Sequence, residues 1–164
     1  MKKIIIMIVI ACSFYTMQSQ PSKRDKKFVE CVAHANLMEV KLAELAQTNA
    51  SRAEVKSLGT KLTDESTSGK TLEGIASKSS IPHPTTLTEK QQKMYNKMAQ
   101  LKGESFDKHY TKCMVKSHKK LLCKFKKQAK KGDNAELKGY ASSSVSTIEN
   151  HKAQAQQTCI AIKK

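Results

Sequence analysis

Apolar residues recur every three or four positions along four long stretches of the sequence, the spacing that places them on one side of an α-helix. The predicted long helices cover about 28–48, 51–79, 105–131 and 134–162. A shorter amphipathic helix is expected at about 88–101, after a proline-containing connection. Four long amphipathic helices with little other regular structure predict an all-α fold, a four-helix bundle.

The segments between these helices contain residues typical of helix caps and turns. Ser51 followed by Glu54 is a capping-box pattern for the second long helix. Gly132 and Asn134 predict a tight turn before the last helix. The segment between the second and third long helices can run the length of a bundle. It therefore permits a long crossover, carrying the short extra helix, that leaves those two long helices parallel.

Four titratable residues interrupt the apolar stripes. Glu39, Glu65, His118 and His151 each lie near the middle of a different predicted long helix, on its otherwise apolar side. A charge in a helical core is costly unless it is paired or bound to a metal. With a rise of about 1.5 Å per residue, the four residues fall within about one turn of a common level. The pattern predicts a polar layer across the bundle.

Two interpretations of this layer remain open. In the first, the two carboxylates pair with protonated histidines and fix the helix register. In the second, the four residues hold one Fe, Zn or Mn ion. A di-iron centre needs Glu-x-x-His on two helices, but Val115 and Ile148 stand three residues before the histidines. Because no nucleophile, nucleotide or phosphate-loop motif is present either, no catalytic residue is predicted.

The first twenty residues have the character of a signal peptide. Two lysines precede a short apolar run that ends in small and polar residues, and the run is too short to span a bilayer. The expected organisation is a signal peptide at 1–20, a short charged leader at 21–27 and a helical domain at 28–162, with no transmembrane segment in the mature chain. Residues 9–12 also resemble a lipobox, so a lipid anchor at Cys12 is the alternative to ordinary cleavage near Ser19 or Gln20.

The charge is strongly basic, at a formal +16, and comes almost entirely from lysine. Arginine occurs only at Arg24 and Arg52, tryptophan is absent and aromatic residues are scarce, which argues against nucleic-acid recognition. An anionic envelope polymer or lipid headgroups are the expected partners, and a plain solvated surface is the alternative. The residues that would bind such a partner crowd the outer face of the third long helix: Lys108, Lys112, Lys116, Lys119, Lys126, Lys127 and Lys130.

Four cysteines lie after the predicted signal peptide. Cys113 and Cys123 are ten residues apart on one predicted helix, about 15 Å along its axis, so they cannot bridge each other. With a crossover topology, Cys31 and Cys123 lie toward one end of the bundle, and Cys113 and Cys159 toward the other. The expected disulfides are therefore Cys31–Cys123 and Cys113–Cys159.

The chain resembles a bacterial family of exported proteins, the ferritin-like domain of unknown function 4142, over about Phe28 to Gln157. The residues that carry the resemblance are Phe28-Val29, Met38-Glu39-Val40-Lys41-Leu42, Leu45-Ala46, Leu62-Thr63-Asp64-Glu65, Phe106-Asp107, Tyr110, Met114-Val115, His118, Glu136-Leu137-Lys138, Thr147-Ile148 and His151. The resemblance implies a ferritin-like four-helix bundle, a periplasmic or outer-membrane-associated location and no assigned activity. The family typically has Asp-His where this chain has Asp64-Glu65, and often Asp where it has Ser117.

These observations together predict an exported cell-envelope protein that acts as a structural or binding module. One alternative is a mononuclear metal-binding protein in envelope stress protection. A second alternative is adhesion to anionic envelope polymer through the lysine-rich helix face.

Overall fold

The computed structural model describes residues 20–64 and 67–163, which form α-helices and no strand. Residues 1–19 of the predicted signal peptide, which include Cys12, and Glu65 lie outside the described residues. The helices are α1 (Lys23–Asn49), α2 (Ala53–Asp64), α3 (Thr67–Lys78), α4 (Glu89–Ala99), α5 (Gly103–Lys131) and α6 (Ala135–Ala161). The all-α prediction is confirmed. No described helix combines the length and the apolar character needed to cross a membrane.

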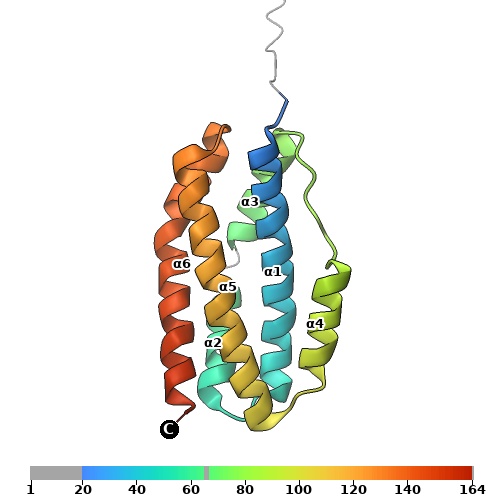
Figure 1. The fold of residues 1–164 in the computed structure, drawn as a ribbon, viewed down its shortest axis with the longest axis vertical. Coiled ribbons are helices and arrows are strands. Elements are labelled where there is room, and N and C mark those ends of the chain that lie inside the picture. The colour runs from blue at the N-terminus through green and yellow to red at the C-terminus, as the bar shows by residue number, and fades with distance from the viewer. Residues whose placement is uncertain (1–19, 65–66, 164) are drawn as a thin grey trace, which may run out of the picture.

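The long helices lie side by side in an elongated bundle, with neighbours running in opposite directions (Figure 1). The start of α1 meets the end of α5, where Arg24 pairs with Asp133 at 3.1 Å. At the other end, the Asn49 amide donates to the carbonyls of Ala99 and Leu101, just before α5 begins. Helices α2 and α3 return along α1 and so run in the same direction as α5. The parallel arrangement expected from a crossover is therefore present.

The connection and α4 run along the outside of α1 (Figure 1). Thr88 and Gln91 form a capping box at the start of α4. The Gln91 side chain also donates to the His34 carbonyl at 2.8 Å, and the Lys41 ammonium lies 5.7 Å from the centre of the Tyr95 ring. These contacts fix α4 to α1, outside the central bundle.

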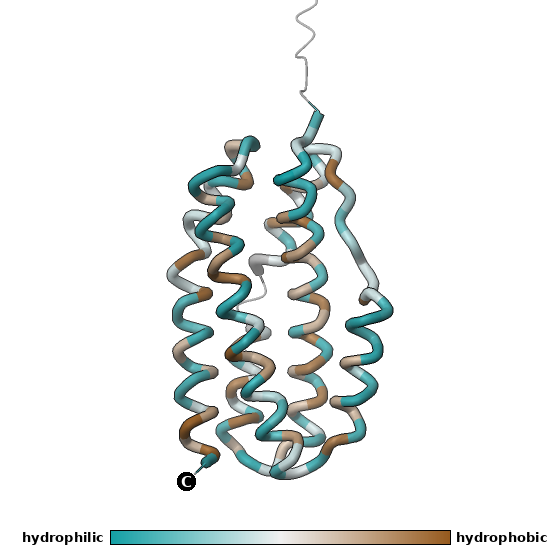
Figure 2. The backbone as a smooth tube through the Cα atoms, viewed as in Figure 1, coloured by the Kyte–Doolittle hydropathy of each residue, from teal (hydrophilic) through white to brown (hydrophobic). Residues whose placement is uncertain are grey.

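Apolar and polar residues are interspersed along every helix (Figure 2). The buried apolar residues form two clusters. One cluster, nearer the start of α1, includes Phe28, Leu72 and Phe125. The other, nearer the end of α1, includes Leu42 and Phe106. Between them lies a level of the bundle at which the core residues are polar. This level coincides with the polar layer predicted from the sequence.

Two helix boundaries differ from the predictions because side-chain contacts decide them. Helix α1 begins at Lys23, within the expected leader, because Ser22 caps it by accepting a hydrogen bond from the Asp25 backbone N–H. The capping box expected from Ser51 and Glu54 is wrong. The Ser51 hydroxyl instead donates to Asp107 of α5 at 2.6 Å, a contact between distant segments that a local pattern cannot reveal.

Candidate metal centre

Three of the four predicted core residues meet in the middle of the bundle. Glu39 comes from α1, His118 from α5 and His151 from α6, and one potential ligand atom from each lies within 4.8 Å of the other two. The side chains are exposed by 1% for His118 and 15% for Glu39, and His151 is also buried. Three separate helices therefore bring a carboxylate and two imidazoles into one small space.

These residues converge because each occupies a gap between the two apolar clusters. On α5, His118 follows the buried Met114 and precedes the buried Leu121. On α6, His151 lies between Ile148 and Ala155 of the two clusters. The apolar neighbours on both sides fix the register of each helix, and the register holds the polar side chains at one level.

The orientation of His118 is set by its own helix. Its Nδ1 lies 3.0 Å from the Met114 carbonyl oxygen, which can only accept, so Nδ1 carries the proton in this contact. In the neutral ring, Nε2 then presents a lone pair. That atom lies 3.4 Å from Oε2 of Glu39. Metal-binding histidines usually donate their other ring N–H to a carbonyl or carboxylate in this way, which fixes the tautomer and the direction of the ligating nitrogen.

The second imidazole lies against the first. The His118 and His151 ring centres are 5.3 Å apart with an interplanar angle of 76°, an edge-to-face arrangement. Two imidazoles held this close in a buried site disfavour a positive charge on both rings.

Burial controls the protonation of His118. It lowers the pKa of His118 to about 4, the nearby His151 acts in the same direction, and the hydrogen bond to Met114 opposes the shift. Loss of hydration is the largest of these effects. His118 is therefore neutral at pH 7, the form that binds metals. A protonated His118 paired with a carboxylate, as one interpretation of the sequence required, disagrees with this burial.

The separation between His118 and Glu39 fits a small divalent ion. In a tetrahedral zinc site with ligands at about 2.0–2.1 Å, neighbouring ligand atoms are about 3.3 Å apart. The 3.4 Å separation of His118 Nε2 and Glu39 Oε2 is close to this value. Two imidazoles and one carboxylate are a ligand set found for zinc and for non-haem iron.

Tyr110 is a neighbour of this centre that the sequence indicated only as a core position. It is fully buried, and its hydroxyl has no hydrogen-bond partner among the described residues. Burial raises the pKa of the phenol above its ordinary range, and the charge of Glu39 adds to the shift. The phenol thus stays protonated and is a hydrogen-bond donor within the electrostatic reach of Glu39.

The other predicted sites do not join this centre. All seven lysines predicted to bind an anionic surface are exposed on α5. Cys31, Cys113, Cys123 and Cys159 are free thiols in this structure, so the Cys31–Cys123 and Cys113–Cys159 disulfides stay predictions. Of the other histidines, His109 is exposed, and His34 and His83 are half-buried.

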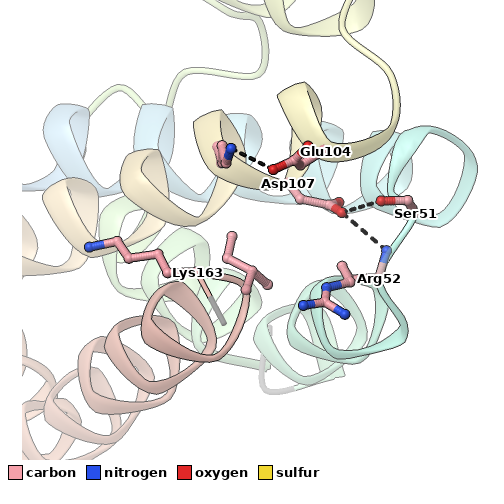
Figure 3. A pocket seen from close by; sticks show the side chains of 7 residues that line it. Ser51, Arg52, Glu104, Asp107 and Lys163 are labelled. Carbon is pink, nitrogen blue, oxygen red and sulfur yellow. Dashed lines mark hydrogen bonds and ion pairs between the residues drawn. The ribbon is translucent and has the colours of Figure 1, made fainter.

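A second polar region lies where α2 and α5 begin and α6 ends (Figure 3). It is a pocket of about 240 Å³ lined by Ser51, Arg52, Glu104, Asp107, Lys108, Ile162 and Lys163. Asp107 is buried and accepts hydrogen bonds from the Ser51 hydroxyl and the Arg52 backbone N–H. Glu104 pairs with Lys108 at 2.5 Å. The Asp107 contacts hold the α1–α2 connection against α5.

The fold and the centre define a class of protein. It is an all-helical bundle in which a carboxylate and two imidazoles are buried between two apolar clusters. The sequence model of the family described as "Domain of unknown function (DUF4142)" matches residues 14–158. The chain therefore belongs to this family. No curated protein and no solved structure matches the chain.

Proposed function

We propose that the protein binds one divalent first-row transition-metal ion in the middle of the bundle, with Glu39, His118 and His151 as ligands. The observation that carries the proposal is the approach of His118 Nε2 to Glu39 Oε2 at 3.4 Å, with the other His118 nitrogen already donating to Met114. Both facing atoms accept hydrogen bonds when His118 is neutral and Glu39 is ionised. A cation between them turns this repulsion into a favourable interaction.

The donor set narrows the choice of ion. Imidazole nitrogens together with one carboxylate suit zinc, iron or manganese, whereas calcium and magnesium prefer oxygen ligands alone. Three protein ligands leave a fourth position for water or a small molecule, as in catalytic zinc sites. Glu65 is a further candidate ligand from the predicted set and lies outside the described residues.

The proposal extends to architecture and location. With α2 and α3 counted as one rod, four rods and one long crossover are the arrangement of ferritin-like proteins, which place metal ligands on facing helices. The signal-like segment at 1–20 supports an exported, envelope-associated protein that holds its ion outside the reducing cytoplasm. No catalytic step is assigned to this centre.

Calorimetric titration of chelator-treated protein with Zn²⁺, Mn²⁺ and anaerobic Fe²⁺ tests the proposal. We expect one equivalent of at least one of these ions to bind per chain. Substitutions Glu39→Gln, His118→Gln and His151→Gln should each weaken binding at least tenfold to a hundredfold, because each removes a ligand. Glu65→Gln, measured in the same series, tests whether a fourth protein ligand contributes.

Matched controls keep this test specific. Glu44→Gln on α1 and His109→Gln on α5 remove exposed groups of the same chemistry from the same helices. They should bind the metal as the unmodified protein does. Binding that is equally weakened by the controls, or unchanged by all three ligand substitutions, would show that the ion binds elsewhere and would contradict the proposal.

A further inference from the structure

Helix α5 carries ten lysines on one side. They are Lys108, Lys112, Lys116, Lys119, Lys120, Lys124, Lys126, Lys127, Lys130 and Lys131, here called the α5 lysine face. At about 100° per residue, all ten fall within about 160° of the helix circumference, opposite the buried side that includes Tyr110, His118 and Phe125. The whole outer surface of this helix is therefore cationic from its first turns to its end.

Few of these charges are neutralised within the chain. Lys108 pairs with Glu104 at 2.5 Å and Lys126 with Glu149 at 2.6 Å, and no ion pair involves the other eight within the part of the chain that the structure describes. Several of the eight are four residues apart, where like charges repel and destabilise a helix. The α5 lysine face thus weakens the isolated helix, and an anionic partner would relieve the repulsion.

The shape of the face distinguishes between partners. From Lys108 to Lys131 the helix rises about 35 Å, which gives one positive charge about every 3.5 Å along the axis. A linear polyanion carries charges at a comparable spacing, about 3.4 Å per phosphate in one DNA strand. The lysines also spread around about 160° of the helix circumference. A flexible polymer can follow this curved surface, whereas a flat bilayer would contact only part of it.

The composition of the face argues against other partners. The exposed large apolar residues among those described are Val40, Met94 and Ile160, none of them on α5, so this helix offers no side chain to insert into a bilayer. This side of α5 also contains no arginine and no exposed phenylalanine, tyrosine or tryptophan that would read or stack nucleic-acid bases. We propose that the α5 lysine face binds a linear, non-nucleic phosphate polymer that lies along the helix.

Size-fractionated inorganic polyphosphate is the probe for this proposal. The face variant replaces Lys112, Lys116, Lys119 and Lys127 with Gln. The control variant replaces Lys61, Lys70, Lys93 and Lys97 with Gln, and has the same net charge, with its changes on exposed positions of α2, α3 and α4. We expect the face variant to bind polyphosphate at least about tenfold more weakly than the control. Its slope of log affinity against log salt concentration should be shallower by about three to four.

Two parallel titrations decide between the partners. Vesicles of phosphatidylglycerol and phosphatidylcholine test a bilayer, and single-stranded DNA of equal charge tests nucleic acid. Tighter binding of either than of polyphosphate would overturn the proposal, as would equal losses in the face and control variants. Thermal unfolding of both variants checks their folding, and the midpoint of the face variant should not be lower than that of the control, because its changes remove like-charge repulsion.

Discussion

His118 combines two properties, near-complete burial and a fixed tautomer with its free nitrogen toward a carboxylate. The first keeps the ring neutral and the second directs its lone pair. The burial results from packing between the two apolar clusters. The tautomer results from the hydrogen bond to the Met114 carbonyl, one helix turn earlier. A protein that only needed to fill this position would be more stable with an apolar residue.

The pH dependence of stability follows from this burial. The unfolded chain binds a proton at His118 near pH 6.5, whereas the folded chain binds one only near pH 4. In metal-free protein, stability should therefore be full above about pH 6.5 and fall as the pH drops toward 4, by on the order of 3 kcal/mol from this residue. Glu39 and His151 are the titratable groups that face the His118 ring. Both are retained in the His118 and His109 variants compared below, so their own titration is common to all the proteins measured.

Denaturant unfolding between pH 4 and pH 7.5 measures this effect. His118→Gln should flatten the loss of stability at acidic pH, whereas His109→Gln, which changes an exposed histidine of the same helix, should leave it unchanged. An identical pH profile for His118→Gln and the unmodified protein would mean that His118 is not the group held neutral by folding.

At the scale of single residues, the sequence was informative where a polar side chain interrupted an apolar stripe. Glu39, His118 and His151 were predicted in this way, and the structure brings them together. The role of Tyr110 was not predictable, because a tyrosine on a core stripe is ordinary and only the three-dimensional packing brings it near Glu39. The free Nε2 of His118 also depends on a backbone contact that the sequence does not specify.

At the scale of elements, one buried carboxylate joins three helices. Asp25 near the start of α1 accepts hydrogen bonds from the Gln128 side chain of α5 and from the backbone N–H groups of Asp133 and Asn134, before α6. Residues 23–27 of the expected charged leader are thus part of α1, and Asp25 fixes the turn between α5 and α6. Local patterns predicted this turn but not the contact that holds it.

Replacing Asp25 should be costly because Asp25 and one of its donors, the Gln128 side chain, are both buried. Asp25→Ala leaves these donors unpaired and should lower the free energy of unfolding by about 2–4 kcal/mol. Glu30→Ala, an exposed change on the same helix, should alter it by less than about 0.5 kcal/mol. Chemical denaturation of both variants provides the comparison, and equal stability of the two would refute the role given to Asp25.

Gly132 ends α5 and is required for space, not for an unusual backbone angle. A Cβ at this position would lie within 2.8 Å of the Gln128 backbone oxygen and would also clash with the Gln128 side chain that donates to Asp25. We expect Gly132→Ala to destabilise the protein by about 1–3 kcal/mol, as overpacking does.

Gly139 supplies the control for this glycine. It lies on an exposed side of α6 with nothing near an added Cβ, so Gly139→Ala should stabilise the protein by about 0.5–1 kcal/mol through helix propensity. Thermal and chemical unfolding should therefore move in opposite directions for the two variants. Destabilisation by Gly139→Ala of the same size would contradict the steric explanation.

At the scale of the whole molecule, the bundle has two apolar clusters with a polar layer between them. The all-α class was predictable because helical periodicity is repeated over most of the chain. The contacts of Ser51 and Arg52 with Asp107 before α2 were not, because packing brings these distant segments together, whereas the Ser22 cap of α1 is a local contact that a sequence pattern can reveal. The family match covers residues 14–158 but describes a domain of unknown function. The function proposed for the protein is therefore argued from the residues of the metal centre and not from the family.

A metal bound across this layer should stabilise the whole bundle. An ion held by α1, α5 and α6 binds the folded state only, so at a free concentration one hundred times its Kd it should add about 2.7 kcal/mol to the free energy of unfolding. The double variant Glu39→Gln, His118→Gln should show no such increase. Calorimetric unfolding with and without excess metal measures it, and equal stabilisation of the double variant would place the ion at another site.

X-ray absorption at the zinc edge of protein reconstituted with one equivalent of Zn²⁺ examines the ligands of a mononuclear ion bound by Glu39, His118 and His151. We expect about four nitrogen or oxygen ligands at about 2.0–2.1 Å, with outer-shell scattering from two imidazoles that falls to one in His151→Gln. A spectrum without imidazole scattering, or one that His118→Gln and His151→Gln both leave unchanged, would contradict this set of ligands.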